Sequence, residues 1–123
     1  MSRTFGEFIR LKRQEQRISL RAFARQIGIS PVYTSNIENG KQTAPSYEVI
    51  LRIAEVLKLN EEEKENMHDL AAETKNYPAI AYDLVEYINA NDHVRKALRL
   101  SRKLRVEDSD WKEFTNHIKE KYL

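Results

Sequence analysis

Two short helical patterns separated by three residues are the feature of this sequence that most restricts its fold. Residues 20–27 place apolar side chains at i, i+3, i+4 and i+7, which is the spacing of one buried helix face. The connection Gly28-Ile29-Ser30 follows, and Pro31 stands where the first residue of a second helix would lie. Gly28 can take the positive φ that turns the chain sharply, and Ile29 can fill the angle between the helices. We therefore expect two helices packed at a steep angle.

Helical spacing continues along the rest of the chain. We expect helices near residues 5–16, from Ser46 to Leu57 and from Asn60 to Glu73, with Asn60 and Glu63 as a capping box. Beyond Tyr77-Pro78 the spacing predicts three more helices, over residues 78–89, 92–104 and 109–122. Three Gly and three Pro in 123 residues leave too few turn residues for a many-stranded fold. The predicted fold is all-α.

Composition excludes several further classes of protein. The chain has no cysteine, which removes disulfide scaffolds, zinc ribbons and thiol nucleophiles. No stretch approaches 18 apolar residues, and the N-terminal sequence lacks the apolar core of a signal peptide. We expect a soluble cytoplasmic protein without a membrane partner.

Charge is distributed unevenly along the chain, although the total is only +2. Residues 1–45 carry eight basic and three acidic side chains. Residues 46–92 carry four basic and eleven acidic side chains, and residues 93–123 carry nine basic and five acidic side chains. The first segment, with a net charge of +5, is a candidate surface for a polyanion, because clustered Lys and Arg release counterions from phosphates. From charge alone we favour the simpler explanation, that the charged residues cover solvated helix faces. A more specific signal is needed to identify a polyanion surface.

The tight connection is typical of a helix-turn-helix, which presents its second helix to the major groove of DNA. The run SLRAFARQIGISPVYTSNIENGKQTAPSYEVILRIAEVL resembles the lambda-repressor-like helix-turn-helix domains of the XRE family of bacterial and phage regulators. The resemblance covers about residues 5–73. It implies a five-helix DNA-binding domain over residues 1–73 and a C-terminal helical extension of about three helices over residues 74–123.

The resemblance also implies how double-stranded DNA would be contacted. The recognition helix would run from Ser30 to Glu38, and Asn36 would pair with a base, preferably adenine. The predicted base contacts are Pro31, Val32, Ser35 and Asn36. The predicted phosphate contacts are Ser19, Arg21, Ser30, Tyr33, Asn39, Lys41, Gln42 and Thr43. In the family an arginine of the first helix pairs with the glutamate that ends the recognition helix, and here these residues are Arg13 and Glu38.

Two positions depart from the family pattern. Leu20 replaces a glutamine that many relatives use to bridge phosphate and recognition helix, and Thr34 occupies an inward position where relatives usually have Leu or Ile. The methyl group of Thr34 can still pack, with a smaller buried area. Neither departure disables the motif, although both would also fit a scaffold module with a degenerate motif.

The C-terminal extension has two notable surfaces. Residues 93–106 contain six basic and no acidic residues, which would suit flanking phosphates, an acidic surface or, as we favour, an amphipathic helix with long basic side chains. The last predicted helix places an aromatic stripe on one face, formed by Trp111, Phe114, Ile118 and Tyr122. Such a stripe fits an intramolecular core, a dimer interface or a surface for a protein partner.

Catalysis finds little support in the sequence. His68, His93 and His117 are far apart, and the carboxylates near Glu61 lie where acids favour a helix start. We predict no enzyme, no cofactor and no metal. The predicted function is a sequence-specific transcriptional regulator, a repressor that binds a palindromic operator as a homodimer. The alternative is an antitoxin or protein-binding inhibitor that uses its helix-turn-helix for autoregulation.

Overall fold

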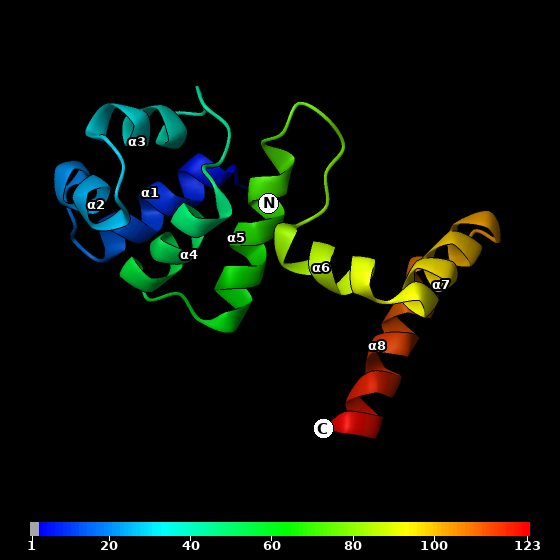
Figure 1. Ribbon diagram of the computed structural model, residues 1–123. Helices are drawn as coiled ribbons and strands as arrows, with labels where there is room; N and C mark the ends of the chain where they lie inside the picture. The colour runs from blue at the N-terminus through cyan, green and yellow to red at the C-terminus, as the bar shows by residue number, and fades with distance from the viewer. Residues whose placement is uncertain (1–2) are drawn as a thin grey trace. The chain divides into compact units, whose positions relative to one another are not determined.

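The computed structural model describes residues 3–123, and this part of the chain forms eight α-helices and no strand (Figure 1). The helices are α1 (Phe5–Glu15), α2 (Leu20–Ile27), α3 (Pro31–Glu38), α4 (Tyr47–Val56), α5 (Glu61–Glu73), α6 (Tyr82–Ala90), α7 (Asp92–Lys103) and α8 (Asp108–Tyr122). The prediction of an all-α fold with five helices followed by about three more is confirmed. None of these helices has both the length and the apolar character needed to cross a membrane.

The chain divides into two compact units, of which the first ends at Val85 and the second is Glu86–Leu123. The first unit holds α1 to α5, the segment that follows α5 and the beginning of α6. Ala81 in that segment is only 4% exposed, so residues after α5 also pack on the first unit. The domain boundary that we predict after residue 73 coincides with the end of α5 and stays a prediction.

Local sequence signals define the helix ends of the first unit. The hydroxyl groups of Ser19, Ser30 and Ser46 each accept a hydrogen bond from a backbone N–H in the first turn of the helix that follows. Asn60 and Glu63 form the reciprocal bonds of a capping box at the start of α5. Gly28 ends α2 in the left-handed conformation, with φ of 81°.

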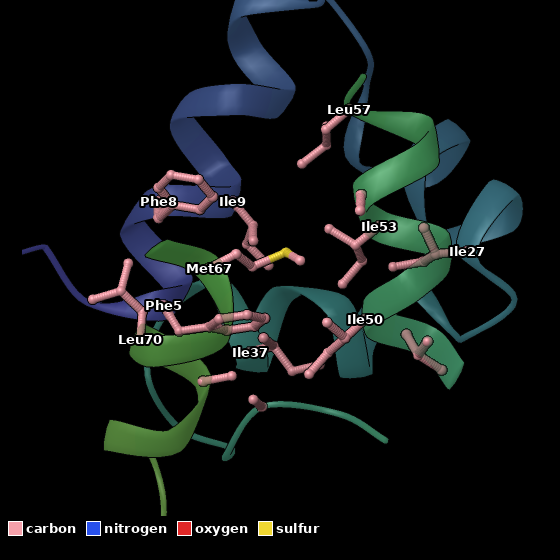
Figure 2. Packing of buried hydrophobic residues seen from close by; sticks show 14 of the residues in the cluster. Phe5, Phe8, Ile9, Ile27, Ile37, Ile50, Ile53, Leu57, Met67 and Leu70 are labelled. Carbon is pink, nitrogen blue, oxygen red and sulfur yellow. The ribbon is translucent and has the colours of Figure 1, made fainter. Parts of the chain in front are cut away.

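The core of the first unit is formed by one face of each of its five helices. Figure 2 shows Phe5, Phe8 and Ile9 of α1 against Met67 and Leu70 of α5, and Ile53 of α4 on the opposite side. Phe23, Ile53 and Met67 have no exposed surface. Full burial of such a side chain contributes about 1.5–3 kcal/mol, so this core holds α2 and α3 at a defined angle.

The second unit has no core of its own. None of the residues 86–123 is buried, and large apolar side chains such as Leu100, Leu104 and Phe114 are more than half exposed. Units of fewer than about 40 residues usually need a metal, a disulfide or a partner to be stable. The exposed apolar surface of this unit therefore requires an explanation.

The predicted start of the helix over residues 78–89 is wrong. Residues 78–81 are not helical, and α6 begins at Tyr82. The apolar spacing of Ile80, Leu84 and Ile88 indicated an earlier start. Pro78 keeps Tyr77 out of the helical conformation. No helix turn forms before Ala81, whose side chain is instead buried against the first unit.

Candidate nucleic-acid interface

The angle between α2 and α3 is set by hydrogen bonds at the end of α2. The N–H groups of Gly28 and Ile29 both donate to the carbonyl oxygen of Ala24, at 2.9 and 3.1 Å. Arg52 of α4 adds a side-chain bond, because its Nε donates to the carbonyl oxygen of Ile27 at 2.9 Å. Ile29 is half-buried against the core. The last carbonyls of α2 are thus satisfied without a further helical turn.

Thr34 occupies the inward position that the sequence assigned to it. Its side chain is fully buried, and its hydroxyl group donates to the carbonyl oxygen of Ser30 at 2.8 Å. This bond satisfies the polar atom at a position where the family resemblance implies Leu or Ile. The departure from the family pattern therefore leaves α3 packed against the core.

The outer face of α3 carries the four residues predicted to contact bases. Pro31 and Val32 are exposed, with 71% of the Val32 surface open, while Ser35 and Asn36 are partly exposed. Within the described part of the chain, the side chain of Asn36 makes no hydrogen bond. Ser35 differs, because its hydroxyl oxygen accepts a hydrogen bond from the amide of Asn39 at 3.3 Å. Asn36 is thus the residue of this face whose side-chain N–H donors and carbonyl acceptor are both free of hydrogen bonds to the described residues.

The residues predicted to contact phosphates surround this face. Arg21 is exposed in the first turn of α2, and Tyr33 is half-buried at the start of α3. The oxygens of Ser19 and Ser30 accept the N–H groups of Ala22 and Tyr33, at 3.1 Å each. The remaining predicted contacts are exposed beyond the end of α3; these are Asn39, Lys41, Gln42 and Thr43.

An ion pair joins α1 to the end of α3. Arg13 donates from Nε to one carboxylate oxygen of Glu38 at 2.8 Å and from Nη2 to the other at 3.0 Å. A third donor of the same guanidinium, Nη1, lies 2.9 Å from the carbonyl oxygen of Ile18. Glu38 is 4% exposed, so its charge depends on these bonds. The structure therefore contains the Arg13–Glu38 pair that the family resemblance implies.

Arg10 is a second arginine at this junction, and it was not predicted from the sequence. Its Nε lies 3.5 Å from Glu38, and its Nη2 donates to the side-chain oxygen of Asn39. The amide of Asn39 is thereby held between Arg10 and Ser35. The signal in the sequence was the position of Arg10, three residues before Arg13 and hence on the same face of α1.

Gly6 allows α1 to approach the last turn of α3 closely. A Cβ atom at this position would overlap the carbonyl oxygens of Ile37 and Glu38. No local signal identifies such a glycine, because it lies inside a helix and not in a turn. The residue fixes how near the base of α3 can lie to α1.

Lys12 links α1 to α5 through Glu63. The hydrogen bond between these side chains raises the pKa of Lys12 and lowers the pKa of Glu63. Glu63 also accepts the backbone N–H of Asn60, which lowers its pKa further. The pair therefore stabilises the α1–α5 contact while both groups are charged.

The four residues of the predicted aromatic stripe all lie on α8. Phe114, Ile118 and Tyr122 are 52%, 42% and 73% exposed, and the Trp111 and Phe114 rings meet edge to face at 6.1 Å. The described residues contain no group of three or more His, Asp or Glu side chains that could hold a metal ion.

Comparison with known proteins agrees with this geometry. Residues 4–67, more than half of the chain, match a family described as a helix-turn-helix domain. A stretch of 56 residues is 38% identical to the HTH-type transcriptional repressor RghR of Bacillus subtilis (strain 168) and covers 46% of this chain. The chain spans less than half of that relative, 42% of its length. A solved SinR protein/SinI protein complex contains a chain of similar fold, with a TM-score of 0.50 and 23% identity over 96% of this chain and 97% of that one.

Proposed function

The chain belongs to the helix-turn-helix domain family, of the lambda-repressor-like XRE type. We propose that it is a cytoplasmic, sequence-specific transcriptional repressor. In this proposal it binds a palindromic DNA operator as a homodimer. The observation that carries the proposal is the outer face of α3. It presents an unengaged Asn36 amide beside an exposed Val32, on a helix anchored from behind by the Arg13–Glu38 pair.

Asn36 reads a base in this proposal. Its amide can donate and accept at once, which matches the donor and acceptor edge of adenine in the major groove. Val32 packs against a thymine methyl group, and Pro31 and Ser35 complete the contact surface. Because Ser35 already accepts a hydrogen bond from Asn39, its hydroxyl is left to donate.

The phosphate contacts hold α3 in register along the groove. Ser19 with Arg21 and Ser30 with Tyr33 lie at the N-termini of α2 and α3, where backbone N–H groups and the helix dipole favour a phosphate. Asn39, Lys41, Gln42 and Thr43 approach the backbone on the other side of α3. Contacts of this kind give affinity without sequence preference and make binding sensitive to salt.

The second unit supplies the dimer interface. It buries no residue by itself and exposes Phe114, Ile118 and Tyr122 on one face of α8. A two-fold interface uses the same patch on both copies, so one apolar stripe is sufficient. The two recognition helices would then meet half-sites about 34 Å apart, one turn of DNA. A palindromic operator follows from this symmetry.

The test replaces Asn36 by alanine in the full chain. The purified original chain first selects its preferred DNA from a library of random sequences. The selected DNA is labelled, and its binding to the original chain and to the variant is measured by fluorescence anisotropy. Loss of a bidentate base contact costs about 1–3 kcal/mol, or roughly 5- to 150-fold in affinity. Asn66→Ala, an exposed residue of α5, is the matched control and should bind like the original chain.

Two results would contradict this function. The original chain could bind selected and random DNA equally at moderate salt, or Asn36→Ala could bind selected DNA as tightly as the control variant. Either result removes the basis for sequence-specific reading by α3.

One observation favours a second function. The exposed apolar face of α8 also suits a different protein chain, and a chain of similar fold comes from a solved complex of two proteins. In that case the chain is an antitoxin or protein-binding inhibitor, and its helix-turn-helix regulates its own genes. A stoichiometric partner that copurifies with the chain, and that is lost when the α8 stripe is changed, would favour this function over the homodimer.

A further inference from the structure

A cavity of about 470 Å³ lies in the first unit, away from the outer face of α3. Its walls come from the start of α4, the second half of α5 and residues 75–85. The volume falls within the range of about 300–1,000 Å³ that is typical of small-molecule sites. None of the predicted DNA contacts lines this cavity.

Aromatic and aliphatic side chains form most of the wall. The rings of Tyr47 and Tyr82 lie 4.5 Å apart, and the ring of Tyr47 is 5.7 Å from that of His68. Ile50 and Ile80 add aliphatic surface. A flat apolar ring would be well accommodated by such a wall, because aromatic rings pack favourably edge to face or offset.

His68 is a buried polar side chain that faces this cavity without a partner. It is 8% exposed, and no described residue forms a hydrogen bond with it. Every side-chain nitrogen or oxygen that is fully shielded from solvent in the described residues has a hydrogen-bond partner. The ring nitrogens of His68 have no such partner, so they must keep some accessible surface. Because these nitrogens are neither shielded nor paired within the described residues, a polar ligand atom in the cavity can form a hydrogen bond with one of them.

The charges of the wall favour an anion. Lys75 lines the cavity, whereas no carboxylate does, and no described acidic group lies within ion-pair distance of Lys75. The N-terminus of α4, capped by Ser46, forms part of the same wall and carries a partial positive charge. Lys75 and the N-terminus of α4 thus both favour one negative group beside an apolar ring.

We propose that this cavity binds a small aromatic carboxylate. The ring lies against the wall formed by Tyr47, Tyr82 and Ile50, and the carboxylate is bound by Lys75 and His68. This site goes beyond the proposed function, because it concerns a small ligand and uses no residue of the DNA-contacting face.

The test titrates the full-length, isotope-labelled chain with indole-3-acetate and follows its amide signals by NMR. Saturable shifts are expected at residues around the cavity, chiefly in α4, the end of α5 and residues 75–82. Neutral indole-3-acetamide has the same ring and should bind about tenfold more weakly, the effect of losing a charged hydrogen bond. Lys75→Gln should weaken indole-3-acetate by a similar factor.

Two further variants make the test specific. Lys112→Gln removes the same charge from exposed α8 and should leave binding unchanged. Ala79→Phe places a ring into the cavity and should abolish binding, while the amide signals of α1 to α3 stay in place. The proposal is overturned if indole-3-acetate gives no saturable shifts, if the shifts lie on the basic helix α7, if the amide binds equally well, or if Ala79→Phe binds normally.

Discussion

Gly6 shows how a single residue can determine the position of the recognition helix. Its missing side chain lets α1 pass directly beneath the carbonyl oxygens of Ile37 and Glu38. These two residues form the end of α3, and Glu38 is also the residue that Arg10 and Arg13 hold. A change at Gly6 therefore acts on the same junction as a change in the ion pair.

Gly6→Ala is expected to destabilise the chain and to weaken DNA binding. The added methyl group overlaps backbone atoms that cannot move without moving α3, and overpacking of this kind costs about 1–3 kcal/mol. Unfolding in urea, followed by circular dichroism, measures the loss. Gly40→Asn is the control and should be nearly neutral, because the position is open and Asn tolerates positive φ. Equal stability of the Gly6 variant and the original chain would refute the close-packing argument.

The contacts of Glu38 show which side-chain interactions could be predicted from the sequence and which could not. The Arg13–Glu38 pair was available from the family resemblance, and the structure contains it. Arg10 was not identified, although it lies one helical turn before Arg13, because a sequence does not reveal which end of α3 approaches that face. The bond from Arg52 to Ile27 was missed for the same reason, since it joins residues 25 positions apart.

At the scale of elements, the helix ends that depend on local chemistry were predicted well. Ser19, Ser30 and Ser46 cap the helices they precede, and Gly28 ends α2. These signals involve residues within four positions of each other, so the sequence contains them directly. The start of α6 was predicted wrongly, because burial of Ala81 against the first unit is a tertiary contact.

The contact between α1 and α5 should depend on pH. Because the pKa of Glu63 is lowered in the folded chain, its contribution is present above about pH 4.5, the ordinary value of a glutamate, and is lost as pH falls through the folded value. The pKa of Lys12 is raised, so its contribution is lost only as pH rises above about 10.5. The pair thus stabilises the fold throughout the neutral range.

Glu63→Gln tests this dependence while keeping a residue that can complete the capping box. At pH 7 the variant should be less stable by up to about 1 kcal/mol, as expected for a partly exposed pair. At pH 3 the difference from the original chain should shrink, and urea unfolding at both pH values measures it. Glu62→Gln, in the same turn, is the control. A difference that is the same at both pH values would exclude the Lys12 pair as its cause.

At the scale of the whole molecule, the distribution of exposed apolar surface differs between the two units. The first unit encloses a core made by α1 to α5, whereas residues 86–123 bury nothing. A helical unit of this size without a core can gain stability by pairing, and the stripe on α8 is the surface that we propose for it.

Phe114→Asp combined with Ile118→Asp is expected to convert a dimer to a monomer. Two charges in the apolar stripe would have to be desolvated on association, and this cost opposes dimer formation. Sedimentation of the full chain at micromolar concentration measures the state. Glu113→Gln, exposed on the same helix, is the control and should leave the dimer intact. If the original chain is itself monomeric, α8 is not a homodimer interface.

The helices of the first unit, most of their ends and the outer residues of α3 could be predicted from the sequence. Each of these follows from the spacing and chemistry of residues that are close in the chain. The contacts of Gly6, Arg10 and Arg52, the late start of α6 and the cavity beside His68 became visible only in the folded chain. These features depend on which helix faces meet across long stretches of sequence, and that choice is made by packing of the whole core.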